Sequence, residues 1–402
     1  MVTNTAPKTT IGTRLSNLGE NFLVLLISLI LALGFCELVL RIYNPLGFRI
    51  RGNKIILPIN KTEIIHHAKL FGKLDPVVTV KRNSLGFRGP ESPADFAHDL
   101  TIVTVGGSTA ECLDLAENKT WPHDLDVLLK PHFNHLWLNN AGLSGNSTYG
   151  HYILMKDYMV KLKPKVVVFL IGINDIGLRS ERDFDERIHE PNFRSLERTL
   201  ATLAVHSQLA AAALNLYRYY FPKSTLMNNQ ADPQETDYRK LLPFTVSPAA
   251  QAAIIKDQQE HYLGPYKQRV ERLLTICRRH NMLPVLVTQP VLYGNCVDPT
   301  TGVNFAHKFV AKHMDGATAW KVLELYNNVV RQVGRDQGVL VIDLARQMPK
   351  DSRYYFDLMH YTNSGAEKVA DIIAAQLTPY LAQKFPQYYQ SGVPPTTNAV
   401  VH

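Results

Sequence analysis

Cysteine is scarce in this chain, and the four that occur follow no metal-binding or redox pattern. Among 402 residues they are Cys36, Cys112, Cys277 and Cys296, and no two of them have the C-x-x-C spacing of a zinc site. Cys36 lies in a long apolar run, which leaves an odd three for pairing. A bridge between Cys277 and Cys296 is one alternative, but buried free thiols are favoured, because free cysteine behaves as a small apolar residue. The sequence therefore excludes a disulfide framework, and it implies neither a metal nor an organic cofactor.

Long runs of one charge are also absent. The formal net charge is +8, yet basic residues alternate with acidic ones, as in RSERDFDERIHE at 179–190. No basic stripe with interleaved aromatic residues is present, so we expect no nucleic-acid partner. The positive charge is better suited to anionic lipid or acidic polysaccharide. With 46% hydrophobic and 19% charged residues, we expect one large folded domain plus accessory segments.

One long apolar run is present, at residues 22–40, with a single charge, Glu37, near its end. About 20 apolar residues suffice to cross a hydrocarbon core, so we predict a transmembrane anchor preceded by an N-terminal tail over 1–21. A cleaved signal peptide is the alternative, but the run exceeds the usual apolar region of about 7–15 residues and no A-x-A-like site follows it. A lipoprotein signal is disfavoured because Phe35 precedes Cys36. Flanking charges would place the large domain in the cytoplasm, but long domains translocate largely regardless of them, and we expect a periplasmic or extracellular domain.

The segments after the anchor differ in composition. Residues 41–98 contain Pro, Gly and basic residues and end in a turn-rich stretch, and we interpret them as a stalk and entry loop. Residues 99–383 carry the strand and helix patterns of the main domain. An insertion over about 179–260, expected to be helical around 194–218, is a candidate lid or partner surface. The tail over 384–402 is rich in Pro and Thr, and we expect it to be disordered.

Five short apolar runs predict the strands of a sheet. They are LTIVTV at 100–105, HLWLN at 135–139, KVVVFLIG at 165–172, LPVLVTQ at 283–289 and GVLVID at 338–343. Near-continuous apolar strands that alternate with helices are typical of the α/β class, in which a parallel sheet is covered on both faces. Apolar residues at helical spacing predict two covering helices, over 261–280 and 364–382.

Small or polar residues follow three of these strands directly. Ser108 comes after a Gly-Gly turn, Gly142 follows the second strand, and Asn174 follows the third. Because the carboxyl ends of parallel strands meet at one edge, we expect the three to lie together there. A serine on such a turn is suited to be a nucleophile, while a glycine N–H and an asparagine amide can stabilise an oxyanion. Each alone has a simpler interpretation as a helix cap or a turn, and the Ser108 segment matches neither the phosphate loop nor the G-x-S-x-G elbow.

Near the carboxyl terminus, Asp357 precedes His360 by three residues, just before a helix. With this spacing the carboxylate can orient the imidazole from the same loop, which leaves the ring free to accept a serine proton. Asp175 and Asp343 also follow strands and compete for the orienting role. Asp357 is favoured for its spacing to the histidine, and Asp343 is interpreted as a strand-end cap. The sequence thus predicts a triad of Ser108, His360 and Asp357.

The blocks Gly-x-Ser, Asn-x-Gly, Gly-x-Asn-Asp and Asp-x-x-His, in this order, resemble the SGNH or GDSL-type hydrolase family over roughly residues 99–383. The resemblance implies a three-layer α/β/α sandwich with a mainly parallel, flavodoxin-like sheet of about five strands, and it implies ester hydrolysis or acyl transfer. It also implies that Ser108 is the nucleophile and that His360 is the general base, oriented by Asp357.

The same resemblance implies an oxyanion hole made of the Ser108 amide together with Gly142 and Asn174. One residue departs from the family's pattern. Gly107 stands where the first block carries Asp, which is compatible with activity because that Asp is not a triad member.

The apolar anchor, the stretch NSLGFRGPE at 83–91 and Thr-Gln-Pro at 288–290 are similar to those of membrane-anchored relatives associated with exopolysaccharide or envelope biogenesis. We therefore expect a membrane-anchored serine esterase or O-acyltransferase. It would act through an acyl-Ser108 intermediate on an acetyl ester of a cell-envelope or exported carbohydrate, with envelope-biogenesis proteins as candidate partners. A lipid esterase similar to lysophospholipases is one alternative. A catalytically idle scaffold subunit of a membrane complex is another, and the intact catalytic set argues against it.

Overall fold

The chain divides into two compact units, which are described separately. The smaller comprises residues 1–56 and 187–222, and the larger comprises residues 57–186 and 223–402. The structure is a computed structural model, and it describes residues 11–43, 50–51, 54–67, 72–179, 203–204, 206–220, 235–311 and 313–390.

The larger unit is built around a five-stranded sheet in which every neighbouring pair of strands is parallel. The strand order is β11-β8-β7-β5-β6, which is the flavodoxin-like arrangement, with β5 and β7 at the point where the order reverses. The predicted α/β class with a parallel sheet is confirmed. The strands are β5 (Leu100–Gly106), β6 (Leu136–Asn140), β7 (Val166–Ile171), β8 (Leu283–Thr288) and β11 (Val341–Ile342).

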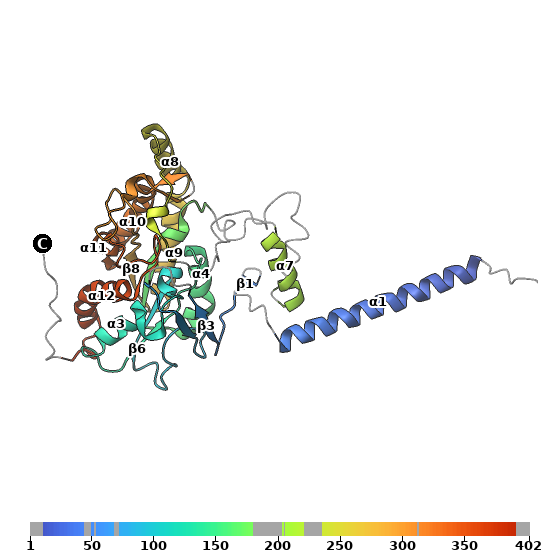
Figure 1. Cartoon of the computed structure of the whole chain (residues 1–402). Helices are drawn as coiled ribbons and strands as arrows, with labels where there is room; N and C mark the ends of the chain where they lie inside the picture. Colours follow the sequence, from blue (N-terminus) through green and yellow to red (C-terminus); the bar gives the residue numbers. More distant parts are fainter. Residues whose placement is uncertain are drawn as a thin grey trace, which may run out of the picture. The chain divides into compact units, whose positions relative to one another are not determined.

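Helices cover both faces of this sheet (Figure 1). On one face, α3 (Trp121–Leu129) and α12 (Asn363–Lys384) pack against each other, and their apolar side chains share one core with Ile102, Val168 and Val287 of the strands. Helices α4, α9 and α10 pack together, with α9 and α10 also against β8. They span α4 (Thr148–Leu154), α9 (Leu263–Arg279) and α10 (Gly316–Gln337).

The remaining strands and α-helices of the described residues, apart from α1, are as follows. The strands are β1 (Ile50–Arg51), β2 (Lys54–Ile55), β3 (Thr62–His66), β4 (Val77–Lys81), β9 (Phe309–Ala311) and β10 (Met314–Asp315). The helices are α2 (Ser108–Glu111), α5 (Val160–Leu162), α7 (Gln208–Tyr220), α8 (Pro248–His261) and α11 (Leu344–Gln347). All four cysteines are free, and Cys112 and Cys277 are buried, as favoured from the sequence.

Residues 57–98 lie within the larger unit, whereas the sequence suggested a stalk and entry loop over 41–98. β3 pairs antiparallel with β4, and alternate residues of β4, Val78 and Val80, are buried. Further along, Arg88 pairs with Asn140 at the end of β6. The valine alternation of β4 is short and flanked by polar turns, so its strand signal is weak, but it attaches this segment to the domain.

The helix content differs from the prediction at two places. α8 and α10 are long helices that the sequence patterns above do not include. α8 is rich in alanine and lies largely exposed, so it has no clear apolar stripe. Of the helix expected around 194–218, residues 194–202 lie outside the described residues.

The predicted strand over 338–343 and the predicted tail also need correction. Gly338 ends α10 in the left-handed conformation, with φ of 63°, so β11 starts only at Val341. The first residues of the expected disordered tail pack on the domain, because the Gln390 N–H donates to the His132 carbonyl oxygen at 2.9 Å. Residues 391–402 lie outside the described residues.

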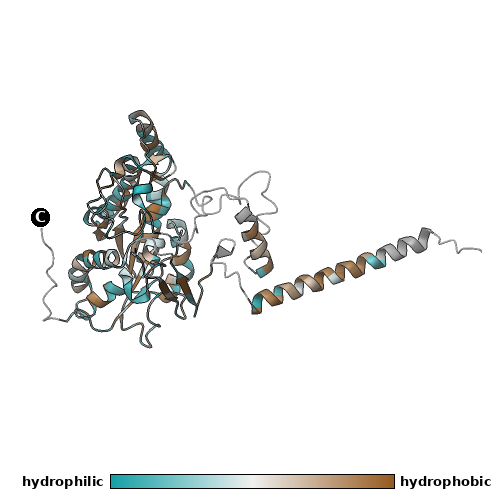
Figure 2. Ribbon diagram, viewed as in Figure 1, coloured by the Kyte–Doolittle hydropathy of each residue, from teal (hydrophilic) through white to brown (hydrophobic). Residues whose placement is uncertain are grey.

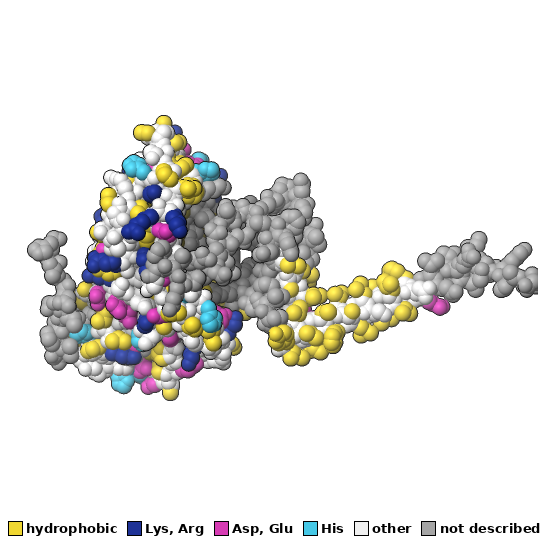
Figure 3. Space-filling model, viewed as in Figure 1, with side chains coloured by type: hydrophobic (Ala, Val, Ile, Leu, Met, Phe, Trp, Pro, Cys, Tyr) yellow, Lys and Arg dark blue, Asp and Glu magenta, His cyan; other side chains and the backbone are white. Residues whose placement is uncertain are grey.

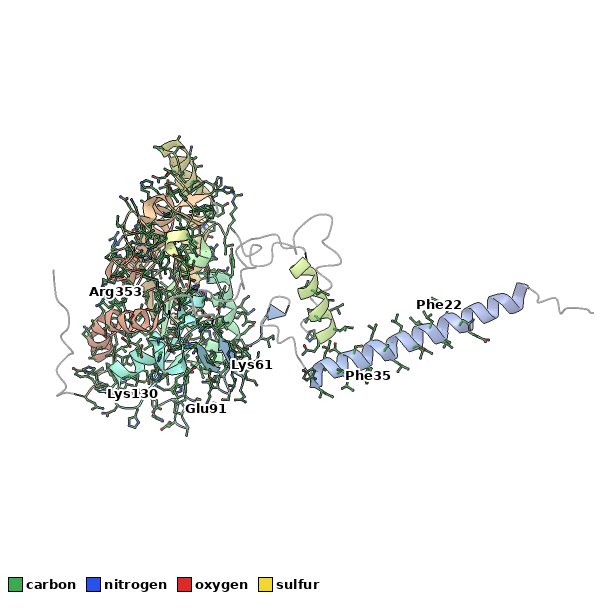
Figure 4. All side chains as sticks on the ribbon, viewed as in Figure 1. Phe22, Phe35, Lys61, Glu91, Lys130 and Arg353 are labelled. Carbon is green, nitrogen blue, oxygen red and sulfur yellow. The ribbon has the colours of Figure 1, made fainter. Side chains whose placement is uncertain are left out.

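The smaller unit contains α1 (Ile11–Ile42). Within it Glu20–Ile42 contains an 18-residue window with a mean hydropathy of 2.8, and no residue of that window is buried, so by length and composition the segment is apolar enough for a membrane span or a signal sequence. Figure 2 shows α1 predominantly hydrophobic over this stretch. In Figure 3 its surface is covered by hydrophobic side chains, whereas charges of both signs are interspersed on the larger unit. Phe22 and Phe35 project outward from the helix in Figure 4.

Glu37, the single acidic residue in the second half of α1, is hydrogen-bonded to the N-terminus of α7. The Glu37 carboxylate accepts from the backbone N–H groups of Gln208 and Leu209, at 3.0 and 2.9 Å, and from the Ser207 hydroxyl at 2.8 Å. Arg41, one turn further along, donates to the same carboxylate at 2.8 Å. Glu37 therefore serves as a cap for the N-terminus of α7, where a negative charge is favourable.

Candidate active site

Ser108 lies where β5 ends and α2 begins, at the reversal point of the sheet where open α/β folds bind ligands. The two glycines before it allow close packing. A Cβ at Gly106 would lie 2.6 Å from the Ala110 Cβ, and a Cβ at Gly107 would lie 2.3 Å from Nδ2 of Asn174. The glycine at position 107 therefore leaves room for the Asn174 amide beside the serine.

Three of the predicted residues form a continuous hydrogen-bonded chain. His360 Nε2 lies 2.7 Å from Ser108 Oγ, and His360 Nδ1 lies 2.6 Å from Oδ2 of Asp357. An ionised carboxylate can only accept, so Nδ1 carries a hydrogen, and in the neutral ring Nε2 is left to accept the Ser108 proton. This is the geometry of a nucleophile, a base and an orienting acid.

The two competing carboxylates are engaged elsewhere. Asp175 is buried against Arg269, with 3.3 Å between Oδ1 and Nη2. Asp343 accepts from an arginine of α10 at 2.7 Å. Of the three candidates, Asp357 is the one that bonds His360 in the described structure.

Charge around His360 favours its protonated form. Burial is the largest single influence and opposes protonation, but the adjacent Asp357 carboxylate outweighs it, so the pKa of His360 is raised above its ordinary value. Burial also disfavours the ionised form of Asp357. The contact with His360 and the N–H groups of His360 and Met359 outweigh burial and hold the pKa of Asp357 below its ordinary value. Asp357 therefore stays ionised and stabilises an imidazolium at His360.

The loop that carries the carboxylate and the imidazole is held at both ends and at its centre. Its ends pair through an antiparallel bridge between Tyr355 and Tyr361. The Tyr238 hydroxyl lies 2.8 Å from the Tyr355 carbonyl oxygen and 3.0 Å from that of Asp357. These contacts restrict the loop, so the carboxylate and the ring are presented together.

Asn174 supplies an amide beside the serine turn. It lies in a 3-10 turn, Ile173–Asp175, entered through Gly172, whose φ of 141° is a conformation that favours glycine. Its Nδ2 donates to the Asn146 carbonyl oxygen at 3.0 Å, which uses one of the two N–H bonds of the amide. The other N–H remains, as does the N–H of Ser108, which as the first residue of a helix has no intrahelical partner.

The structure contradicts the assignment of Gly142 as an oxyanion donor. Its N–H donates to Oδ1 of Asn140 at 2.9 Å, so the group is already bonded. A Cβ at this position would lie 2.4 Å from the backbone nitrogen of Glu111. Glycine is required here because the loop after β6 packs directly against the backbone of α2.

The open amide in this loop belongs to Gly145. The Asn146 N–H donates to the Leu143 carbonyl oxygen at 3.1 Å, closing a turn in which Gly145, with φ of 78°, holds the third position that favours glycine. In the described part of the chain, the Gly145 N–H has no hydrogen-bond partner. The sequence signal for this amide is the turn Ser-Gly-Asn at 144–146, three residues beyond the glycine that directly follows the strand.

A buried carboxylate supports this turn from behind. Glu111, the last residue of α2, accepts from Arg82, from the Ser144 N–H at 2.6 Å and from the Ser144 hydroxyl. Arg88 donates to three carbonyl oxygens in and just after α2, at 2.6 to 2.9 Å. Both arginines precede the domain boundary expected at residue 99, so the segment interpreted as an entry loop holds α2 and the Gly145 turn.

A small pocket opens at Ser108 and His360. Its small size suits a small group such as a short acyl chain. Burial raises the pKa of Cys112, in the pocket wall, to about 12, so its thiol stays protonated and does not compete as a nucleophile. The described residues contain no group of three or more His, Cys, Asp or Glu side chains placed to hold a metal ion. The other lining residues are Thr109, Asp114, Leu115, Phe356 and Tyr361.

Comparison with known proteins gives one family match and several distant structural matches. The model of the GDSL-like Lipase/Acylhydrolase family matches residues 104–368. No curated protein matches the chain. Among solved structures, a catalytic mutant of an acetylxylan esterase from Geobacillus stearothermophilus is 14% identical, with 68% of this chain and 91% of that chain covered and a TM-score of 0.38.

Two further solved structures are similarly distant. An alpha/beta hydrolase enzyme from the metagenome of Lake Arreo, Spain, is 15% identical over 70% of this chain and 95% of that chain, with a TM-score of 0.39. The psychrotrophic esterase EstA from Pseudoalteromonas sp. is 11% identical over 70% of this chain and 99% of that chain, with a TM-score of 0.37.

Proposed function

The chain belongs to the GDSL-like lipase/acylhydrolase family, and on this premise we propose that it is a serine esterase that works through an acyl-Ser108 intermediate. The observation that carries the proposal is the pair of short contacts of His360, 2.7 Å to Ser108 Oγ and 2.6 Å to Asp357 Oδ2. Ser108 is the nucleophile, His360 the general base and Asp357 the group that orients the imidazole.

In the first half of the reaction, Ser108 Oγ attacks the ester carbonyl carbon while its proton passes to Nε2 of His360. The carbonyl oxygen becomes an oxyanion, with the N–H groups of Ser108 and Gly145 and the Asn174 amide as donors. Loss of one such donor typically costs about 3–4 kcal/mol of transition-state stabilisation. The imidazolium, stabilised by Asp357, then protonates the leaving alcohol oxygen as the C–O bond breaks.

In the second half, an acceptor hydroxyl attacks the acyl-Ser108 ester while His360 takes its proton. The imidazolium then returns that proton to Ser108 Oγ as the acyl–Oγ bond breaks. Water as acceptor makes the enzyme an esterase, and a sugar hydroxyl makes it an O-acyltransferase, with the same residues in the same roles. The small pocket supports an acetyl-sized acyl group. We propose an acetyl ester of a cell-envelope or exported carbohydrate as the substrate.

We further propose that α1 anchors the protein in a membrane as a single span, with the catalytic unit outside the cytoplasm and envelope-biogenesis proteins as candidate partners. The 18-residue window of mean hydropathy 2.8 within Glu20–Ile42 supports the anchor. Extraction of the membrane fraction with alkaline carbonate tests it, because a spanning helix stays with the lipid and a peripheral protein is released. Protease added to intact spheroplasts tests the side, since an external catalytic unit would be digested.

Two alternatives have weaker support. A lipid esterase needs room for long acyl chains, and the small pocket at Ser108 offers little. An idle scaffold has no need of a nucleophile, a base and an orienting acid in hydrogen-bonding contact.

The test of the esterase uses the full-length chain in detergent, with a fluorophosphonate label and p-nitrophenyl acetate. Wild type should label and turn over the ester, Ser108→Ala should lose both, and His360→Ala should lose turnover by roughly 10³-fold or more. Ser92→Ala, at an exposed serine, is the matched control and should behave as wild type. Failure of folded wild type to label or to turn over the ester would refute the proposal.

A further inference from the structure

A second carboxylate, Asp114, lines the pocket that contains Ser108 and His360. It follows α2, and its Oδ1 lies 3.3 Å from Nε2 of His67, which precedes it by 47 residues. The Asp114 side chain is 14% exposed, and that of His67 is 3% exposed. The triad uses neither side chain, and their pairing is not visible in the sequence.

The hydrogen-bond partners of His67 determine where its protons lie. Its Nδ1 is 2.8 Å from the Asp75 carbonyl oxygen, which can only accept, so Nδ1 carries a hydrogen. In a neutral imidazole, Nε2 would then be an acceptor facing the acceptor oxygen of an ionised Asp114. A hydrogen bond between them therefore requires one further proton on the pair, either as imidazolium with carboxylate or as imidazole with carboxylic acid.

The pair is fixed in position and retains one unused oxygen. Lys119 binds the Asp75 side chain at 2.8 Å, so the residue that bonds Nδ1 of His67 is itself anchored. In the described structure, Oδ2 of Asp114 has no hydrogen-bond partner. Much of the surrounding wall is apolar, including Leu115 and Phe356. Asp114 thus brings a polar acceptor to a largely apolar pocket.

Asp114 lines the same pocket as His360, the residue that would protonate the leaving alcohol. In the proposed reaction, His360 delivers its proton to the leaving alcohol oxygen, so groups near that imidazole meet the alcohol. Asp114 is near enough for its charge to favour protonated His360, although burial and Asp357 have larger effects. A fixed acceptor at this place suits an alcohol with a second hydroxyl close to the esterified oxygen.

We propose that Asp114, held by His67, is a specificity residue that accepts a hydrogen bond from a free hydroxyl of a sugar-like alcohol. The inference rests on the proposed esterase function and narrows its substrate class to short-chain esters of polyhydroxylated alcohols. A simple ester without a second hydroxyl gains nothing from Asp114.

Asp114→Asn in the full-length protein tests this assignment. The new amide can donate to Nε2 of neutral His67, so the contact survives while the charge and the shared proton are lost. Two substrates are compared, a mono-O-acetylated methyl glucoside and p-nitrophenyl acetate, which has no hydroxyl. The matched control is Asp95→Asn, because Asp95 and His98 form an exposed Asp–His pair.

We expect kcat/KM for the sugar ester to fall about 3- to 10-fold, because the asparagine oxygen can still accept from the hydroxyl but lacks the charge that makes such a bond roughly twice as strong. The loss should lie mainly in KM, because the hydroxyl is bound in both the ground state and the transition state. Asp114 also raises the pKa of His360, so the two proteins are compared at the pH plateau of each profile, where turnover of p-nitrophenyl acetate should change by a smaller factor than that of the sugar ester. The activity that remains shows that the variant is folded. Equal losses on both substrates, or none on either, would overturn the assignment while leaving the esterase in place. Absence of labelling and turnover in wild type would instead refute the esterase, and this inference with it.

Discussion

Two buried arginine–carboxylate pairs lie behind the candidate active site, and their arginines differ. The carboxylates are alike, because Glu111 accepts from Arg82 and twice from Ser144, and Asp175 accepts from Arg269 and from the N–H and hydroxyl of Thr148. Arg82 donates to Glu111 and, at 3.4 Å, to the Gly86 carbonyl oxygen. Arg269, on the α9 side, bonds four residues. Its acceptors are Thr148 Oγ1 at 2.7 Å, the Tyr149 hydroxyl at 3.1 Å, the Leu178 carbonyl oxygen at 3.2 Å and Asp175 Oδ1 at 3.3 Å.

The difference indicates which member of each ion pair contributes more to the stability of the fold. Removing one member of a buried ion pair typically costs about 3–5 kcal/mol, because an uncompensated charge is left. The cost should be smaller where the remaining group keeps other hydrogen bonds. The acid should therefore matter more on the α2 side, which supports the Gly145 turn, and the base should matter more on the α9 side, which supports the loop of Asn174.

Replacing Arg269 with Met should have the largest effect on stability. We expect the free energy of unfolding to fall by about 3–5 kcal/mol, because Asp175, 1% exposed, loses its cation. Urea unfolding of the full-length chain in detergent measures it. Arg82→Met is the matched variant, and it should cost only about 1–3 kcal/mol. Each carboxylate keeps two bonds from a neighbouring residue, but the loss of Arg269 also deprives Thr148, Tyr149 and Leu178 of a donor. Equal losses in the two variants would contradict this difference between the two arginines.

Replacing Glu111 with Gln should lower the free energy of unfolding by about 3 kcal/mol, near the lower end of the range for a broken buried ion pair. One carboxylate oxygen accepts from Arg82 and the other from the Ser144 N–H, so whichever way the amide turns, its NH2 group faces a donor. Because the Gly145 turn loses its support, kcat/KM for p-nitrophenyl acetate should also fall, toward the roughly 10²-fold that one oxyanion donor is worth. Glu260→Gln, at an exposed residue of α8, should change neither quantity.

Asp175→Asn is the matching change in the pair with Arg269, and it should lower the free energy of unfolding by only about 1–2 kcal/mol. Arg269 and the Thr148 hydroxyl both bond Oδ1, which an asparagine oxygen can replace. Oδ2 has only a shared contact with the Thr148 N–H at 3.2 Å. The same urea titration compares Asp175→Asn with Glu111→Gln. An equally large loss of unfolding free energy in the two variants would mean that the arrangement of donors around the carboxylate does not determine the cost of its replacement by an amide.

Among the quantities measured on these variants, the pH dependence of kcat/KM should change least. The base must be unprotonated to act. Because the pKa of His360 is raised above its ordinary value of about 6.5, activity should fall as the pH is lowered through that raised pKa. The carboxylates that raise this pKa are Asp357 and Asp114. Glu111→Gln and Asp175→Asn should therefore lower the height of the profile and leave its midpoint in place. A displaced midpoint of the pH profile in either variant would show that the charge of the replaced carboxylate acts on the His360 imidazole.

Much of the sheet and the triad could be predicted because their signals are local. Apolar runs of strand length lie in β5, β6, β7 and β8, and each begins or ends within a residue or so of its prediction. Asp357 and His360 share one loop, so a spacing of three residues suffices to bring them together. Ser108 follows the strand that places it, and one long-range contact completes the chain to His360.

The predictions that failed depend on packing between distant segments. Gly142 and Gly145 look alike in sequence, but the first N–H is bonded by Asn140 and the second is open. Residues 57–98 contain turns and charges that resemble a stalk, yet Arg82 and Arg88 from this segment are buried against α2. Burial of those arginines follows from acceptors that lie about 30 residues away along the chain.

The sequence by itself determined the α/β class, the order of the candidate site residues at the ends of the strands and the local Asp-x-x-His unit, because alternating apolar runs and short spacings act over a few residues. Only the tertiary structure decided which glycine amide remains open, which arginine supports which carboxylate, and that His67 meets Asp114 in the pocket. The physical reason is that a hydrogen-bonding group is defined by its partner, and these partners are brought together only when the sheet, its covering helices and the segment before them pack.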